Sequence, residues 1–147
     1  MHAWVAVLVV LISGTLVALQ APTNAVVARA VNSPVNAALV SFAVGTAALL
    51  VAAFVLRVRP DLAAVKGLPW WAWLGGLYGA VFVAAAAFAT PRIGVAATLT
   101  LLVAGQLVMA AALDHFGALG VPRQEITPLR LLGLALVAGG VLLVRRF

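Results

Sequence analysis

Long apolar segments without a charged side chain alternate along this chain with short polar ones. The uncharged segments run over residues 1–28, 37–56, 67–91, 93–113 and 131–144. About 20 mainly apolar residues cross the ~30 Å hydrocarbon core of a bilayer, so the first four segments are long enough to span it. The fifth, with 14 residues, reaches spanning length if its helix begins at Pro128 and Arg130 extends toward the lipid headgroups.

Helix-start and helix-stop signals set the boundaries of these segments. A hydroxyl residue followed by proline, a typical helix start, occurs at residues 33–34, 90–91 and 127–128. Pro69 opens the third helix, and Gly117 and Gly120 are typical of the end of the fourth. The pattern predicts an all-α integral membrane protein with a single membrane domain over residues 1–147, whose helices cover about 4–20, 34–56, 69–89, 91–115 and 128–145.

Composition agrees with a protein that lies in the bilayer. Hydrophobic residues make up 66% of the chain, charged residues 8%, and the mean hydropathy is +1.23. A soluble domain keeps about a quarter of its residues charged, so this chain cannot cover a water-facing surface. Because the chain has no cysteine, it has neither disulfides nor a thiolate metal site, and we expect no metal and no cofactor. Only His2 precedes the first apolar segment, which therefore lacks the basic start of a signal peptide and is expected to be retained.

The net charge of +6 comes from basic residues scattered singly and in pairs between the apolar segments. This distribution is typical of helix-end anchors that face lipid headgroups. Nucleic acid is not an expected partner, because no basic patch with interleaved aromatic residues is present. The expected environment is the inner (cytoplasmic) membrane, crossed several times.

Basic residues are almost evenly divided between the two sides of the membrane. With five spans, the side of the N-terminus carries Arg57, Arg59, Lys66, Arg123 and Arg130. The other side carries Arg29, Arg92, Arg145 and Arg146. An excess of basic residues normally fixes the cytoplasmic side, and here the excess is one. Either the three basic residues in 57–66 fix one orientation, or copies insert both ways and pair head to tail as an inverted repeat.

Several motifs resemble the YdcZ-like family of the drug/metabolite transporter superfamily. They are Gln20-Ala-Pro-Thr-Asn24, Pro69-Trp-Trp-Ala-Trp-Leu-Gly-Gly76, Pro91-Arg-Ile-Gly94, the pair Gly105-Gln106, and Asp114-His-Phe-Gly117. The resemblance implies five helices that form half of a ten-helix inverted-repeat transporter, completed by an antiparallel partner. That partner is a second copy in a dual-topology homodimer or an oppositely oriented paralogue, and the balanced charges favour the homodimer.

This resemblance implies a small secondary transporter that exports a small metabolite or drug-like molecule by alternating access. Two other classes remain open: a small dual-topology ion channel, and a membrane accessory or scaffold protein that transports nothing. We do not expect an enzyme, because the sequence has no Ser/His/Asp set, no metal-ligand spacing and no Gly-rich phosphate loop.

Few polar residues interrupt the predicted spans. If the first helix continues past its apolar part, Gln20 and Asn24 lie on one face and flank Pro22, which removes a backbone donor. These amides either contact substrate or bind nearby backbone groups. Gln106 lies in mid-helix, where an unpaired amide is costly, so it either bonds another helix or lines the pathway. The candidate substrate pathway comprises Gln20, Asn24, Ser41, Trp73, Tyr78 and Gln106.

Asp114 and His115, near the end of the fourth helix, are the only candidates for ion coupling, because no ionisable residue lies deep in a span. The helix dipole disfavours an anion at Asp114, which therefore needs a counter-charge unless it is simply exposed to headgroups. We predict that Arg29 or Arg92 of an inverted copy supplies it.

Glycines mark candidate sites of close helix packing. Gly75 and Gly79 form a Gly-x-x-x-Gly step in the third helix, which permits close approach of another helix. In the fifth helix Gly133, Gly139 and Gly140 leave room on the helix surface, which suits close packing of another helix or dimer formation.

Overall fold

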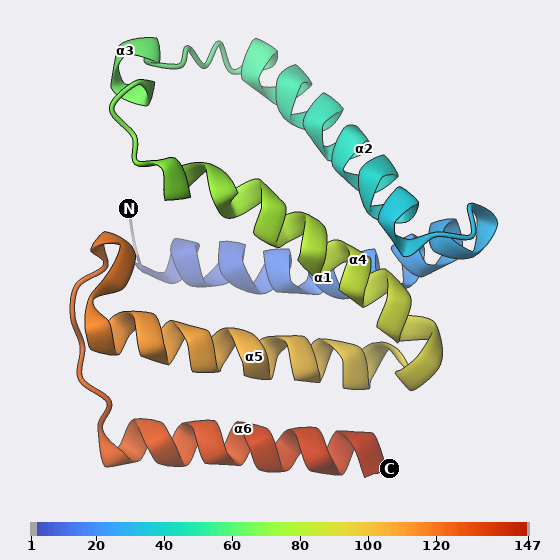
Figure 1. The fold of residues 1–147 in the computed structure, drawn as a ribbon, viewed down its shortest axis with the longest axis vertical. Coiled ribbons are helices and arrows are strands. Elements are labelled where there is room, and N and C mark those ends of the chain that lie inside the picture. Colours follow the sequence, from blue (N-terminus) through green and yellow to red (C-terminus); the bar gives the residue numbers. More distant parts are fainter. Residues whose placement is uncertain (1–2, 147) are drawn as a thin grey trace. The chain divides into compact units, whose positions relative to one another are not determined.

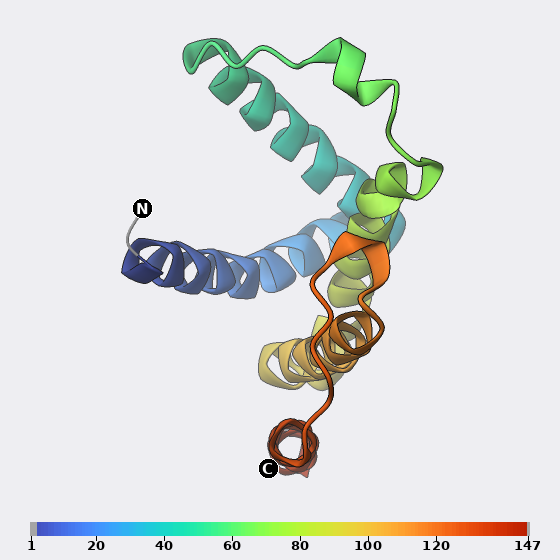
Figure 2. The same ribbon diagram turned by 90° about the vertical axis from the view of Figure 1, so that its left-hand side faces the viewer.

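The computed structural model describes residues 3–146, and helices occupy most of that range (Figures 1 and 2). The elements are α1 (Ala3–Ala30), α2 (Pro34–Val55), α3 (Leu62–Val65), η1 (Trp70–Leu74), α4 (Gly75–Ile93), α5 (Val95–Phe116), η2 (Ala118–Gly120) and α6 (Pro128–Arg146). Four segments are long and apolar enough to cross a membrane: Trp4–Ala30, Pro34–Val55, Trp70–Ile93 and Val95–Phe116. The apolar part of α6, Pro128–Val144, is shorter. All five predicted helices are present, four of them at full spanning length.

The chain forms two compact units, Met1–Pro91 and Arg92–Phe147. In the first unit, α1 and α2 are antiparallel, pack against each other near the turn that joins them, and diverge away from it (Figure 1). In the second unit, α5 and α6 are antiparallel and lie side by side. Whether the chain behaves as one membrane domain stays a prediction.

The predicted end of the first helix near residue 20 is wrong, because α1 continues to Ala30 with Pro22 inside it. Proline removes one backbone donor, and neighbouring side chains can compensate for the loss in a membrane helix. The Thr23 hydroxyl lies 3.0 Å from the Leu19 carbonyl oxygen and 2.9 Å from that of Gln20. These two bonds do not reach the Ala18 carbonyl, which is the one that the missing Pro22 donor leaves free.

The turn between α1 and α2 confirms the predicted start at residues 33–34. Ser33 caps α2, since its Oγ accepts a hydrogen bond of 3.1 Å from the Asn36 amide, and Pro34 takes the first helical position. Asn32 has φ 51°, a left-handed conformation that asparagine tolerates better than most residues. The Ser33 amide donates to the Ala28 carbonyl at 3.0 Å and ends α1.

The predicted start of the fourth helix at residues 90–91 is wrong. Helix α4 continues through Pro91 to Ile93, and α5 begins at Val95. The chain turns at Gly94, whose φ of 82° is readily available only to glycine. The Thr90 Oγ, which we expected to cap a helix, is buried and has no hydrogen-bond partner in the described part of the chain.

The other predicted boundaries are confirmed to within a few residues. Pro69 precedes the 3₁₀ turn η1, which leads directly into α4. Helix α5 ends at Gly117 in the left-handed conformation with φ 60°. At the start of α6, the Thr127 Oγ accepts a hydrogen bond of 3.3 Å from the Arg130 amide.

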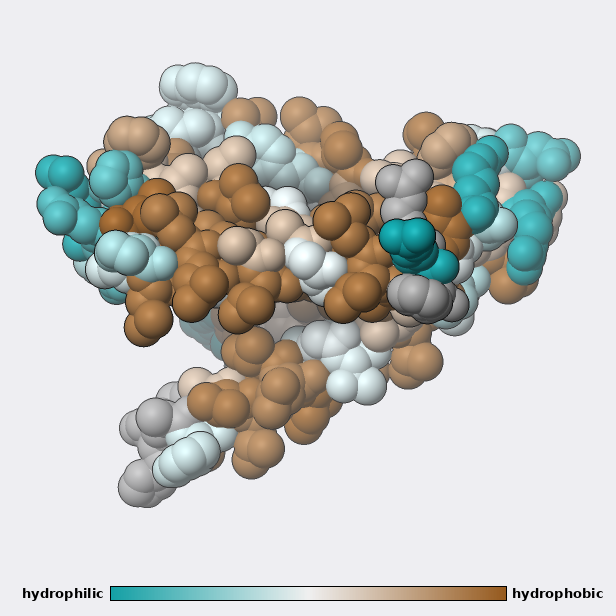
Figure 3. All heavy atoms as spheres, turned by 90° about the horizontal axis from the view of Figure 1, so that it is seen from below, coloured by the Kyte–Doolittle hydropathy of each residue, from teal (hydrophilic) through white to brown (hydrophobic). Residues whose placement is uncertain are grey.

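The core of the first unit consists of small residues. Ala28, Ala37 and Ala87, from α1, α2 and α4, are buried together with Val27 packed against them. Large apolar side chains lie outside instead, such as Leu49 and Phe54, and hydrophobic residues dominate the surface that Figure 3 shows. Such a surface is stable against lipid or a protein partner and unstable in water.

Candidate functional site

A side-chain hydrogen bond joins α1 and α2 within their apolar length. The Gln20 Nε2 donates to the Ser41 Oγ at 3.4 Å, and both side chains are partly buried. The pair is one of few side-chain bonds between different helices, because most hydroxyls in the spans bond the carbonyl four residues earlier in their own helix. Thr98 and Thr100 do so at 2.7 Å each. Gln20 and Ser41 thus form a polar contact between two membrane helices.

The Gln20–Ser41 pair lines a pocket of about 220 Å³ in the first unit. Its lining residues are Gln20, Ser41, Phe42, Gly45, Thr46, Leu49 and Val83. After their mutual bond, the Gln20 Oε1 and the Ser41 hydroxyl proton are available for further hydrogen bonds. The Thr46 hydroxyl bonds no group in the described chain. The pocket therefore offers several neutral hydrogen-bonding groups and no charge.

Asn24 lies one turn beyond Gln20 on the same face of α1 and is only 7% exposed. No hydrogen bond to its side chain occurs within residues 3–146. The other buried residues of α1 are all alanines, namely Ala21, Ala25 and Ala28. Its amide group nonetheless keeps some exposed surface, because among the described residues the Thr90 Oγ is the only enclosed side-chain polar atom without a hydrogen-bond partner. Gln20 and Ser41, both predicted from the sequence, thus meet between α1 and α2, and Asn24, predicted as well, lies on the same face of α1 as Gln20.

A second pocket, of about 370 Å³, lies between α5 and α6 in the second unit. It is lined by Leu107, Ala110, Ala111, Asp114, Arg130, Gly133, Leu134 and Val137. The Arg130 Nη1 lies 3.5 Å from the Asp114 Oδ2, and both side chains are 38% exposed. Asp114 has a counter-charge in its own chain, which the sequence analysis did not name. A signal was available, because the five-span topology already places Asp114 and Arg130 on the same side of the membrane.

The segment between α5 and α6 folds back over the end of α5. The Gln124 amide donates to the Asp114 carbonyl at 2.7 Å, and the Arg123 Nε donates to the His115 carbonyl at 3.1 Å. The His115 Nδ1 accepts from the Ile126 amide at 3.4 Å, and Arg130 also bonds the Gln124 side chain. The first two bonds satisfy carbonyls that a helix end leaves free, and all four hold the connecting segment against the adjoining helices.

The remaining predicted pathway residues do not line these pockets. Trp73, Tyr78 and Gln106 are exposed on the single chain. The Gln106 amide has no hydrogen bond to any described residue. Arg29 and Arg92 lie in the last turns of α1 and α4, and their pairing with Asp114 of an inverted copy stays a prediction.

Among the five predicted packing glycines, only Gly79 has another helix so close that an added Cβ would contact it within the described chain. A Cβ on Gly79 would lie 3.1 Å from the Phe42 Cζ of α2, closer than ordinary van der Waals contact. Added Cβ atoms on the other four would meet nothing within 4 Å in the described chain: Gly75, Gly133, Gly139 and Gly140. Those four have open space beside them, which for Gly133 is part of the α5–α6 pocket, whereas Gly79 already accommodates the Phe42 ring.

Comparison with known proteins indicates the family of this chain. The family model described as "Putative inner membrane exporter, YdcZ" matches residues 5–143. The inner membrane protein YdcZ of Escherichia coli (strain K12) is 35% identical over 82 residues. That alignment covers 56% of this chain and 55% of the relative, so the chain spans about half the length of the curated protein it matches. No solved structure matches.

Proposed function

Because the chain belongs to the YdcZ family of multi-pass inner membrane proteins, we propose that it is a secondary transporter that exports a small metabolite or drug-like molecule. The observation that carries the proposal is the neutral polar pocket around Gln20 and Ser41. Polar side chains within membrane spans are costly and commonly mark substrate pathways. The substrate is moved without chemical change.

The pocket provides a physical basis for selective binding. Gln20 and Ser41 hold each other in place, so their free hydrogen-bonding groups are already oriented before a substrate enters. Preorganised groups lose little conformational entropy on binding. In apolar surroundings, each bond that they form to a substrate is also stronger than it would be in water.

The proposed working unit is an antiparallel homodimer, with an oppositely oriented paralogue as the other possible partner. The five-to-four division of basic residues supports insertion in both orientations. The exposed amide of Gln106, in the middle of α5, supports a protein partner or an aqueous pathway on that face, because an unpaired amide in lipid is costly. Two inverted copies make a symmetric pair that can alternate between inward-open and outward-open states.

Reconstitution tests this proposal. The purified protein is screened in detergent for small molecules that raise its unfolding temperature, and each hit is then measured for flux in proteoliposomes. We expect saturable flux that Ser41→Ala reduces at least about tenfold, as loss of one buried hydrogen bond allows. Ser13→Ala is the matched control, because the Ser13 hydroxyl is exposed and bonds its own helix at the Val9 carbonyl.

The outcomes separate the function classes. Non-saturable flux would indicate the ion-channel class, and stabilisation without any flux would indicate an accessory protein. Saturable flux that is equally fast in the wild type and in Ser41→Ala would keep the transporter and reject this pocket.

A further inference from the structure

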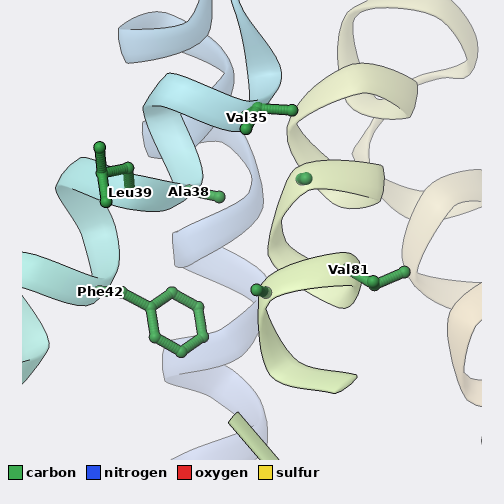
Figure 4. A pocket seen from close by; sticks show the side chains of 7 residues that line it. Val35, Ala38, Leu39, Phe42 and Val81 are labelled. Atoms are coloured by element: carbon green, nitrogen blue, oxygen red, sulfur yellow. The ribbon is translucent and has the colours of Figure 1, made fainter. Parts of the chain in front are cut away.

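The Phe42 side chain lies between two hollows of different chemistry. On one side is the polar pocket of Gln20, Ser41 and Thr46. On the other is an apolar groove of about 470 Å³ between α2 and α4, shown in Figure 4. Phe42 is the one residue that lines both hollows. Its ring points from α2 toward α4 (Figure 4).

Gly79 determines where this ring can lie. A methyl group at position 79 would come within 3.1 Å of the Phe42 Cζ and 3.6 Å of its Cε1, so the ring would have to move by a few tenths of an ångström. Gly76, on the same helix, faces open space, and a Cβ there meets nothing within 4 Å. The missing side chain at Gly79 therefore has a specific structural consequence that Gly76 does not share.

The two hollows differ in what they can bind. The groove is lined by carbon side chains alone, such as Val35, Leu39 and Val81. The polar pocket supplies hydrogen bonds but no charged group. A permanent cation would lose its hydration there without gaining a counter-charge, which is strongly unfavourable. A neutral molecule with a polar head and an apolar body would match both hollows.

We propose that Phe42, seated on Gly79, is a specificity-determining residue that selects uncharged amphiphiles, with the polar head at Gln20 and Ser41 and the apolar body in the groove. This inference rests on the proposed transport function for its biological meaning. The proposed selectivity is a difference in binding affinity, so it can be measured without transport. The ring sets the width of the passage between the two hollows, and with it the size of the bridging part of the ligand.

Two fluorescent probes that share the dansyl ring system test the charge requirement in lipid nanodiscs. Dansylamide is uncharged and can donate and accept hydrogen bonds, whereas dansylcholine is a permanent cation. We expect dansylamide to bind at least about tenfold more tightly, and Ser41→Ala to weaken it about three- to tenfold, as one hydrogen bond allows. Equal affinity for both probes, or an unchanged Kd in Ser41→Ala, would overturn the proposal. Binding that is present in short-chain detergent and lost in nanodiscs would overturn it too, because lipid acyl chains would then occupy the groove.

A double-mutant cycle tests the role of Phe42 and Gly79. Gly79→Ala should change the dansylamide Kd about three- to tenfold, whereas the matched control Gly76→Ala should leave it unchanged. In a Phe42→Ala background, Gly79→Ala should have little further effect, because the ring that it displaces is absent. Phe42→Leu, which keeps most of the apolar volume, serves as the second background if Phe42→Ala unfolds. Additive effects of the two substitutions in the usable background would reject the proposed role of Phe42.

Failure of this inference and failure of the transporter proposal are distinguishable. If both binding results hold but proteoliposomes show no flux, the selection by Phe42 stands and the transport function falls. If flux is saturable but the cycle is additive, the transport function stands and the role of Phe42 falls.

Discussion

The Arg130 guanidinium lies 3.5 Å from the Asp114 carboxylate and joins the first turn of α6 to the last turn of α5. Each charge lies at the helix end where the macrodipole disfavours it, an anion at a C-terminus and a cation at an N-terminus. Their mutual attraction, and the bond from Arg130 to Gln124, offset this unfavourable placement. The pair is partly shielded and borders the α5–α6 pocket.

Exchanging the two charges tests this relationship. Asp114→Arg alone puts two cations together and should lower the free energy of unfolding by about 1 kcal/mol. The double variant Asp114→Arg/Arg130→Asp restores the attraction and aligns both charges with the helix dipoles. It should match or exceed the wild type by a few tenths to about 1 kcal/mol. Unfolding titrations in mixed micelles measure both effects.

Charge exchange also shows whether Asp114 pairs with an arginine of its own chain or with one of an inverted copy. Arg130→Asp should rescue Asp114→Arg better than Arg29→Asp or Arg92→Asp does, because Arg130 contacts Asp114 in the same chain. Better rescue by Arg29→Asp or Arg92→Asp would favour pairing across the dimer. No rescue by any of the three would mean that Asp114 is a solvated helix end.

Replacing the polar residues of α1 should separate stability from transport. Gln20→Leu and Asn24→Leu are each expected to reduce saturable flux at least about tenfold. Asn24→Leu should leave stability unchanged or raise it, because it replaces an amide that bonds no described residue by an apolar group of similar shape. Flux in proteoliposomes and unfolding temperature in detergent are the two measurements. Normal flux in both variants would assign these amides a purely structural role.

Dual topology can be measured directly, since the chain contains no cysteine. Val31→Cys and Pro60→Cys place one thiol at each end of α2 on exposed positions and leave the charge unchanged. A membrane-impermeant maleimide applied to the outer face of the inner membrane should label part of the population at each position. Complete labelling of one position and none of the other would contradict the homodimer and indicate a partner of fixed opposite orientation.

Gly117 should be the glycine least tolerant of alanine in the α5–α6 unit. Its φ of 60° costs an alanine about 1–2 kcal/mol, and the new Cβ would lie 3.3 Å from the Arg123 Cβ. Gly105→Ala is the control, because that Cβ would meet nothing within 4 Å and the helix gains propensity. A Gly117→Ala variant as stable as the wild type would show that the connector adapts without strain.

The sequence by itself determined the five long helices, the membrane environment and the polar residues of the spans. Apolar segments of spanning length leave little choice of solvent or secondary structure, because unpaired backbone groups are too costly in lipid. Local caps were also predictable where the bonds are local, as at Ser33 and Thr127. The placement of Gln20 and Asn24 on one face followed from helical periodicity once α1 continued past Pro22.

Only the tertiary structure decided which of these residues meet. The sequence assigned Thr90 to a helix cap, but the chain turns at Gly94 and leaves the Thr90 hydroxyl buried. It marked Gly79 as a packing glycine without indicating that Phe42 occupies the space beside it. It also did not indicate that Arg130 pairs with Asp114. The Phe42–Gly79 and Asp114–Arg130 contacts join residues at least 16 positions apart. Their geometry depends on how helices cross, and periodicity along one helix does not encode the crossing.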